Sequence, residues 1–285
     1  MRLFVTGASG MVGAEVARQA RHSGIECSAF THHELDITRA SDVASAIQDA
    51  SPDIVINAAA YTAVDQAEQD EALAMLVNKT GARNVATAAS DIGAGVIHIS
   101  TDYVFDGEAN EAYRPTDATN PINAYGRSKL AGEIEAASAC ARHAIVRTSW
   151  VYSHEGHNFV RTMLRLAESG KEIKVVDDQQ GAPTAAADLA AALLKTAKMM
   201  CDRSVAGTFH FTNAGVTTWY NFANAIFEMR GLTDVTLRPI STAEFSTPAK
   251  RPQWSVLDCS TFEKEFEIKP RTWRSALSET LNRIK

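Results

Sequence analysis

Tyr125 and Lys129 place a phenol and an ammonium group four residues apart. In a helix, both side chains project from one face, a single turn apart. A free phenol titrates near about 10 and a nearby cation favours the phenolate, so Lys129 is expected to lower the pKa of Tyr125. A tyrosine tuned in this way can act as a general acid. By itself the pair is equally typical of an exposed helix face, so its neighbours in the sequence decide the interpretation.

A hydroxyl-rich run, Ser100–Tyr103, ends an apolar strand and precedes Tyr125 in the chain. Thr101 is predicted to hydrogen-bond a substrate carbonyl oxygen while Tyr125 protonates that oxygen. Lys129 is predicted to hold the nicotinamide ribose as well. These three residues are the candidate catalytic group, and Asn78 is expected to orient them or to hold the backbone around them.

A glycine-rich turn follows the first apolar strand and opens a predicted helix. The first glycine permits the tight turn, the second lets the backbone approach a pyrophosphate, and the third allows close helix packing. The helix N-terminus adds amide donors and positive potential. The spacing is GxxGxxG rather than GxGxxG, and a tight turn without a nucleotide is the alternative. We predict that a dinucleotide contacts Gly7, Gly10, Met11, Val12 and Gly13.

The end of the second predicted strand bears on the choice between NAD and NADP. An acidic residue there would bond the ribose 2′-hydroxyl and repel a 2′-phosphate. The chain has Phe30-Thr31-His32-His33 at this point, with Glu34 slightly beyond. Thr31 can donate a hydrogen bond and the histidines can become cationic, so the sequence favours NADPH, with NADH as the alternative.

Further residues near the strand ends are predicted to contact the cofactor. Asp36 could reach the adenine edge or could instead cap the turn that follows it. The small residues Ala58, Ala59 and Ala60 leave room for a cofactor across the sheet, or serve tight helix–sheet packing. The predicted contacts outside the glycine loop are Thr31, Asp36, Ile37, Ala58, Ala59, Ala60, Thr62, Tyr125 and Lys129.

Strand-like and helical segments alternate along the first half of the chain. This order predicts an α/β protein with a doubly wound parallel sheet of the Rossmann type. One long helix is expected over roughly residues 71–92. After Trp150 the alternation of strand-like and helical segments becomes less regular. We predict a dinucleotide-binding domain over residues 1–150 and a smaller, mainly substrate-binding lobe over residues 151–285, with some segments returning to the first domain.

The composition limits the classes of partner. The 285 residues carry a net charge of −6 without a long basic run, so nucleic acid is not an expected partner. No apolar stretch reaches the roughly 18–20 residues of a membrane span, and the chain starts directly on a strand, so we expect a cytoplasmic protein without a membrane partner. The four cysteines lack the spacing of zinc or redox motifs and are expected to be reduced thiols.

Taken together in this order, the motifs resemble the extended short-chain dehydrogenase/reductase family. The matching stretches span nearly the whole chain and lie at 57–65, 100–107, 125–133, 147–152, 181–184 and 251–252. The resemblance implies reduction of the 4-keto group of a nucleotide sugar, dTDP-4-dehydro-L-rhamnose, by NADPH. It implies that Thr101, Tyr125 and Lys129 are catalytic and that the first two also touch the substrate. Asp102 and Trp150 would face the sugar, and Arg251 would hold the diphosphate.

Two positions depart from patterns within the wider family. Some members dimerise through a magnesium ion held by acidic residues, one of them at the position of Glu15. The second acidic cluster has only Asp188 here, and hard cations want several oxygen ligands, so we predict no metal site and leave monomer or homodimer open. In the sugar dehydratases an acidic residue follows Thr-Asp. Tyr103 stands there in this chain, which favours simple reduction.

Two alternatives to this function stay open. The first is a reductase that acts on a different nucleotide-linked 4-keto-deoxysugar, since pocket details decide the stereochemistry. The second is a noncatalytic dinucleotide-binding subunit that regulates a partner enzyme. Retention of Thr101, Tyr125 and Lys129 argues against the second, because a pure binding module does not need all three.

Overall fold

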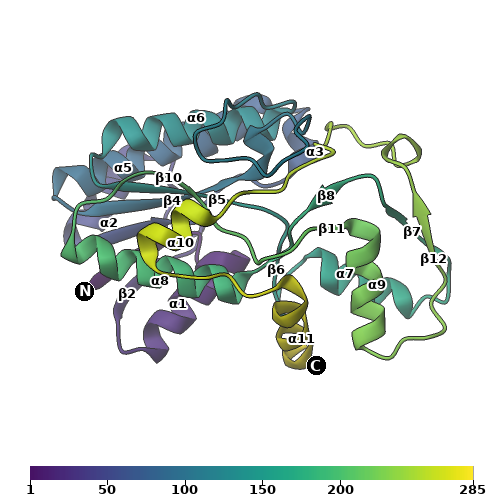
Figure 1. Ribbon diagram of the computed structural model, residues 1–285. Helices are drawn as coiled ribbons and strands as arrows, with labels where there is room; N and C mark the ends of the chain where they lie inside the picture. Colours follow the sequence, from purple (N-terminus) through teal and green to yellow (C-terminus); the bar gives the residue numbers. More distant parts are fainter. Residues whose placement is uncertain (285) are drawn as a thin grey trace.

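A six-stranded parallel sheet forms the centre of the molecule (Figure 1). The computed structural model describes residues 1–284. The strand order is β10-β5-β4-β3-β1-β2, and every neighbouring pair runs parallel. The strands are β1 (Arg2–Thr6), β2 (Glu26–Phe30), β3 (Ile54–Asn57), β4 (Gly95–Thr101), β5 (His143–Thr148) and β10 (Ala206–His210). The predicted doubly wound α/β fold is confirmed.

Helices cover both faces of this sheet (Figure 1). One face carries α1 (Met11–His22), α8 (Ala186–Asp202) and α10 (Ser260–Phe266), and the other carries α2 (Ala40–Ala50), α5 (Ala82–Asp91) and α6 (Ala124–Ala139). Side chains alternate along β1, so Leu3 and Val5 join the core with α1 and α8, whereas Phe4 joins the core with α2 and α5. Strands covered on both faces need apolar residues at successive positions, which explains their unbroken apolar runs.

The sheet changes its winding direction between β1 and β3. β2 lies beyond β1 on one side, while β3, β4 and β5 follow in order on the other. Ligands of open α/β sheets bind outside the carboxyl ends of the strands at such a switch point. Here β1 and β3 end at Thr6 and Asn57, and Thr6 Oγ1 donates to Asn57 Oδ1 at 2.7 Å. The candidate cofactor loop follows Thr6 and therefore lies at this edge.

The helix expected over roughly residues 71–92 is interrupted. It consists of α4 (Glu71–Met75), a π-helical turn η1 (Leu76–Gly81) and α5. The π turn carries the buried Asn78. A helical pattern of apolar residues does not reveal a single wide turn, so the sequence suggested one continuous helix. Turns of this kind often lie at functional sites.

A smaller lobe contains α7 (Phe159–Ala167), α9 (Trp219–Met229) and α11 (Trp273–Arg283) around an aromatic core (Figure 1). The ring centroid of Phe222 lies 5.5 Å from that of Phe159 and 5.6 Å from that of Trp273. The parallel pair β7 (Ile173–Val176) and β12 (Leu237–Ile240) flanks this core. The short elements are α3 (Val64–Ala67), η2 (Asp102–Val104), β6 (Val151–Tyr152), β8 (Gln180–Gly181), β9 (Thr184–Ala185), β11 (Thr217–Thr218) and η3 (Thr242–Glu244).

Three elements after residue 150 belong to the large sheet or to the helices that cover it. β10 pairs with β5, while α8 and α10 pack in the core on the face that carries α1. The division of the chain at residue 150 stays a prediction. Among the helices of the described residues, none has the length and apolar character needed to cross a membrane. All four cysteines are free thiols.

Candidate active site

The glycine loop lies at the switch point against the end of β3. Gly7 has a φ of +69°, a left-handed conformation that favours glycine. A Cβ on Gly7 would lie 2.7 Å from the carbonyl oxygen of Ala58 and 2.6 Å from the amide nitrogen of Ala59. The loop and the small residues after β3 thus approach each other as closely as their backbones allow.

The first amides of α1, which follow this loop, lack a side-chain cap and suit a phosphate. Gly10 is the N-cap of α1 and provides no side-chain cap for the first amides. Gly10 is exposed, and Met11 and Val12 are partly exposed. Gly13 packs against Gly7, where any side chain would strike the Gly7 carbonyl. Exposed, uncapped amides at the positive end of a helix suit a pyrophosphate, so these residues fit the dinucleotide that the sequence predicts.

The end of β2 presents a carboxylate beside the glycine loop. The amide of Ala8 donates to the Phe30 carbonyl at 2.9 Å and ties the loop to this strand. Thr31 donates from both its amide and its hydroxyl to Glu34 Oε2, each at 2.8 Å. These bonds also lower the pKa of the exposed Glu34. The hydroxyl expected to favour a 2′-phosphate therefore already has an acidic partner, which weakens the argument that Thr31 selects NADPH.

Replacing Glu34 with glutamine is expected to raise the NADPH-to-NADH ratio of kcat/KM about three- to fivefold. The change removes a negative charge at nearly constant shape, and interactions between exposed charges are weak, so the expected change is small. Steady-state rates at limiting concentrations of each cofactor measure the ratio. Glu26→Gln, at the opposite end of β2, is the matched control and should leave it unchanged. An unchanged or lower ratio in E34Q would contradict this role of the carboxylate.

Asp36, Ile37 and Thr62 differ in what they present. Asp36 Oδ1 accepts from the Thr38 amide at 3.0 Å and the Thr38 hydroxyl at 2.9 Å, so this side chain caps the following turn. Ile37 is buried in the core with α2 and α5. Thr62, after β3, is exposed. The capping alternative for Asp36 is thus realised, and the contact of all three with a cofactor stays a prediction.

The candidate catalytic residues converge at the same edge of the sheet. Thr101 is the last residue of β4, and Tyr125 lies in the first turn of α6. Asn123 caps this helix by accepting from the Gly126 amide at 2.7 Å. A Cβ on Gly126 would strike the carbonyl oxygen of Tyr103, so glycine lets α6 approach η2. The rings of Tyr103 and Tyr125 consequently meet edge to face at 5.5 Å.

Thr101 links a phenol to a carboxyl group. Its side chain lies beside the phenol of Tyr125 and acts to lower the pKa of that phenol. Its hydroxyl also donates to Asp102 Oδ1 at 3.0 Å and accepts from the Tyr103 amide at 3.2 Å. Tyr125, Thr101 and Asp102 therefore form one chain of polar groups at the end of β4.

The pKa of Tyr125 is raised, so the expectation that Lys129 lowers it is wrong for this structure. Burial is the main cause of the rise, the nearby Asp102 adds to it, and the Thr101 side chain opposes it. Lys129 Nζ instead donates to the carbonyl of Ile99 at 2.6 Å. A raised pKa keeps the phenol protonated near neutral pH, which is the state that a general acid needs.

Asn78 holds the backbone around these residues, one of its two predicted roles. Its Nδ2 donates to Ser128 Oγ at 2.8 Å, and its Oδ1 accepts from the Tyr61 amide at 2.8 Å. Ser128 Oγ in turn donates to the Tyr125 carbonyl at 2.7 Å. The π turn η1 is thereby joined to α6 and to the segment after β3.

Asp102 and Trp150 flank the catalytic residues at the ends of β4 and β5. Asp102 is buried, its Oδ2 has no hydrogen-bond partner within residues 1–284, and burial raises its pKa to about 7. Trp150 has a φ of +48°, and its ring stacks on Trp219 with centroids 3.7 Å apart. Strained backbone and unpaired buried polar atoms cluster at ligand sites, so both features suit contact with a sugar.

Arg251 reaches the site from the C-terminal part of the chain. Its guanidinium binds Asp65 in a bidentate pair, with Nη1–Oδ1 at 3.2 Å and Nη2–Oδ2 at 2.8 Å. Nη1 also donates to the Thr247 hydroxyl, and the Tyr103 side chain lies close enough to contribute to the raised pKa of Arg251. Arg251 thus lies near Tyr103 with Asp65 as its ion-pair partner, and its contact with a diphosphate stays a prediction.

Glu15 and Asp188, the carboxylates considered for a metal, are each paired with arginine. Glu15 accepts from Arg18 Nη2 at 2.6 Å and lies 3.6 Å from Arg283 Nη1, and its pKa is lowered to about 2 by these partners against the effect of burial. Asp188 accepts from Arg271 Nη2 at 2.7 Å. The described part of the chain contains no group of three His, Cys, Asp or Glu side chains suited to a metal ion. These residues do not fit the magnesium site of other family members.

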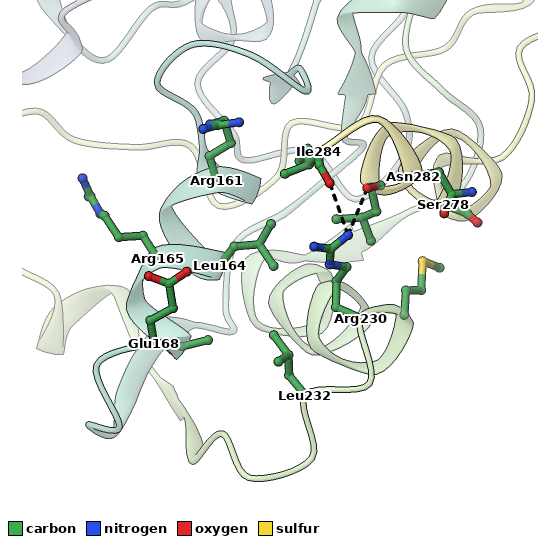
Figure 2. A pocket seen from close by; sticks show the side chains of 12 residues that line it. Arg161, Leu164, Arg165, Glu168, Arg230, Leu232, Ser278, Asn282 and Ile284 are labelled. Atoms are coloured by element: carbon green, nitrogen blue, oxygen red, sulfur yellow. Dashed lines mark hydrogen bonds between the residues drawn. The ribbon is translucent and has the colours of Figure 1, made fainter.

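A separate open pocket of about 620 Å³ lies between α7, α9 and α11 (Figure 2). Figure 2 shows Arg161 and Arg165 on α7 at one side and Arg230 after α9 at the other. Arg230 Nη1 donates to the carbonyls of Leu281 at 3.2 Å and Ile284 at 3.5 Å, at the end of α11. The residues predicted to bind the cofactor or substrate are not among those that line this pocket.

Comparison with known proteins gives a consistent relationship. The family model of the RmlD substrate binding domain matches residues 1–285. A dTDP-4-dehydrorhamnose reductase from Sinorhizobium fredii is 44% identical over 283 residues, covering 97% of this chain and 95% of the relative. The crystal structure of a dTDP-4-dehydrorhamnose reductase from Clostridium acetobutylicum is 41% identical, with a TM-score of 0.94 and 99% of both chains covered. The same enzyme from Bacillus anthracis, in complex with NADP, is 38% identical, with a TM-score of 0.93, 99% of this chain and 98% of that chain covered.

Proposed function

Because the chain belongs to the RmlD substrate binding domain family, we propose that it is an NADPH-dependent oxidoreductase that converts dTDP-4-dehydro-L-rhamnose to dTDP-L-rhamnose. Support comes from relatives named for this activity that match nearly the whole chain, one of them solved with NADP. The observation that carries the proposal is the convergence of Thr101, Tyr125 and Lys129 beside the uncapped amides of α1.

The residues divide the work of a carbonyl reduction. NADPH, when bound, supplies the hydride. The amides that follow Gly10 would hold its pyrophosphate, and Lys129 would hold the nicotinamide ribose. Thr101 would hydrogen-bond the C4 carbonyl oxygen, and Tyr125 would deliver a proton to that oxygen. The products are an alcohol at C4 and the oxidised cofactor, so protons and electrons balance.

The sugar and diphosphate contacts follow from the same geometry. Asp102 and Trp150 would face the sugar, the first with its unpaired carboxyl oxygen. Arg251 would turn part of its guanidinium from Asp65 to the diphosphate, since its planar fork matches phosphate oxygens. Tyr103 replaces the acid that a dehydratase would need, so reduction without loss of water is expected.

The setting of the enzyme is part of the same proposal. A net charge of −6 offers no footprint for nucleic acid, which leaves the nucleotide sugar as the expected partner. We infer a cytoplasmic enzyme that does not bind membranes and acts as a monomer or homodimer. The paired states of Glu15 and Asp188 favour an assembly that does not depend on magnesium.

A panel of ketosugars tests the proposal. NADPH oxidation is measured with 4-keto-6-deoxysugars linked to dTDP, GDP and UDP, and the product is identified by NMR. We expect the highest kcat/KM with dTDP-4-dehydro-L-rhamnose. Preference for another nucleotide or sugar would favour the related-reductase alternative, and no turnover with any of them would favour the noncatalytic one.

A further inference from the structure

Glu133 and Arg147 form an ion pair behind the catalytic residues, with exposures of only 5% and 4%. Glu133 Oε1 accepts from Arg147 Nε at 2.8 Å and Oε2 accepts from Nη2 at 2.7 Å, a bidentate geometry. Taking two charges out of water is costly, and well-packed apolar residues would often be at least as stable. A buried pair at this place therefore suggests a role beyond stability.

Glu133 continues the face of α6 that carries the chemistry. Tyr125, Lys129 and Glu133 follow one another at four-residue spacing and so lie along one side of the helix. Glu133 Oε1 also accepts from Ser100 Oγ at 2.5 Å. Ser100 immediately precedes Thr101 in β4, so Glu133 joins the catalytic helix to the catalytic strand.

Arg147 joins the same point to β5. In the sheet register Ser100 lies opposite Arg147, and Thr101 lies opposite Thr148. Glu133 therefore accepts hydrogen bonds from both Ser100 and Arg147, which form the register pair next to Thr101 and Thr148. This arrangement fixes the end of β4 from two sides.

The charges around Lys129 give the Glu133 carboxylate a second role. Glu133, on the next turn of α6, and His98, on β4, are the titratable groups that interact with the charge of Lys129. Burial lowers the pKa of Lys129 to about 8, and the Glu133 carboxylate acts in the opposite direction. His98 stays neutral because burial and Lys129 both lower its pKa. Without the charge of Glu133, the buried cations Lys129 and Arg147 would both lose their anionic neighbour.

We propose that the Glu133–Arg147 pair is a positioning device for the reaction: it fixes the strand end that carries Thr101, and it places a negative charge one helical turn from Lys129. The inference rests on the reductase function proposed above. Glu133 acts through Thr101 and Lys129 and is therefore a positioning residue rather than a catalytic one.

Two substitutions of Glu133 separate charge from geometry in the pH profile of kcat/KM. Glu133→Gln removes the charge at constant shape and should move the alkaline limb, set by deprotonation of Lys129, about one pH unit lower. Activity at pH 8 should then fall about fivefold further than activity at pH 6. Glu133→Asp keeps the charge, but its shorter side chain moves the carboxylate away from Ser100 and Arg147. We therefore expect kcat/KM to fall at every pH while the alkaline limb stays at the wild-type pH.

Arg147→Gln should move the alkaline limb in the opposite direction. It also provides a second variant that can be measured if Glu133→Gln does not fold. It removes the cation that neutralises Glu133 and leaves the carboxylate charged, so the alkaline limb should move to higher pH. A limb that stays at the wild-type pH in E133Q or R147Q, or moves in the wrong direction in either, would overturn the role of the charge. A limb that moves in E133D as it does in E133Q would also overturn it.

Thermal unfolding without cofactor gives a readout that is independent of turnover. Glu133→Gln should lower Tm at pH 7, and the difference from wild type should shrink towards pH 10, where Lys129 is neutral in both proteins. A difference that is constant with pH indicates a merely structural role and refutes the proposal. A wild-type protein without ketosugar turnover would refute the reductase function instead, and the Tm comparison would still decide the role of Glu133.

Discussion

Replacing Tyr125 with phenylalanine is expected to lower kcat for ketosugar reduction by about 10²- to 10⁴-fold, the usual contribution of a positioned general acid. The phenol lies beside Thr101, and its raised pKa keeps it protonated near neutral pH. Phenylalanine keeps the ring against Tyr103 but has no proton to give. The loss should therefore appear in kcat, with the dissociation constant for NADPH nearly unchanged.

Tyr103→Phe is the matched control for this substitution. Tyr103 lies on the adjoining turn, packs against the same ring and also has a pKa raised by burial. Because its phenol is not expected to donate the proton, Y103F should lose far less activity than Y125F. Equal losses in both variants, or a Y125F enzyme as fast as wild type, would contradict the assignment of Tyr125 as the acid.

Replacing Lys129 with methionine is expected to lower kcat/KM by at least about 10²-fold while raising the thermal stability of the free protein. The activity falls because the cation that would hold the nicotinamide ribose is lost. The stability rises because Lys129 is only 3% exposed and its charge is costly to bury. Function and stability therefore oppose each other at this residue.

The size and pH dependence of the stability gain follow from the pKa of Lys129. Burial lowers it from 10.5 to about 8, which corresponds to a cost of about 3 kcal/mol, and the lost bond to Ile99 offsets about 1 kcal/mol of the gain. The cost is fully present below pH 8, where the lysine is charged in both states. It vanishes above about pH 10.5, where the lysine is neutral in both states.

Calorimetry of the free protein at pH 7 and pH 10.5 measures this gain. K129M should unfold several degrees above wild type at pH 7, with a much smaller difference at the higher pH. Lys79→Met, an exposed lysine paired with Glu135, is the control and should change Tm little at either pH. A K129M protein less stable than wild type at pH 7 would show that burial of this charge is not costly.

The parts of the site that depend on local pattern could be predicted from the sequence. The glycine loop follows an apolar strand, and Thr101 ends another, so a parallel sheet brings both to one edge. The four-residue spacing of Tyr125 and Lys129 required only that α6 be a helix. The fold class and the convergence of these residues followed from the same order of elements.

The parts that depend on how elements pack against each other could not be predicted. The pKa of Tyr125 rises because α6 and η2 bury the phenol, and Lys129 reaches the backbone of β4 instead of the phenol. Glu133 and Arg147 meet only because α6 crosses β5. One signal was available, since Glu133 lies on the same helical face as Tyr125, two turns along.

The fate of deuterium in the sugar product tests the central claim most directly. Wild-type enzyme is given dTDP-4-dehydro-L-rhamnose and NADPH deuterated at both positions of nicotinamide C4, in ordinary water. The reductase function predicts dTDP-L-rhamnose with deuterium on C4 of the sugar, and the reverse labelling, with unlabelled NADPH in D₂O, should leave protium there. Turnover with the label absent from C4 or on another carbon, or no turnover at all, would contradict reduction of the 4-keto group by this protein.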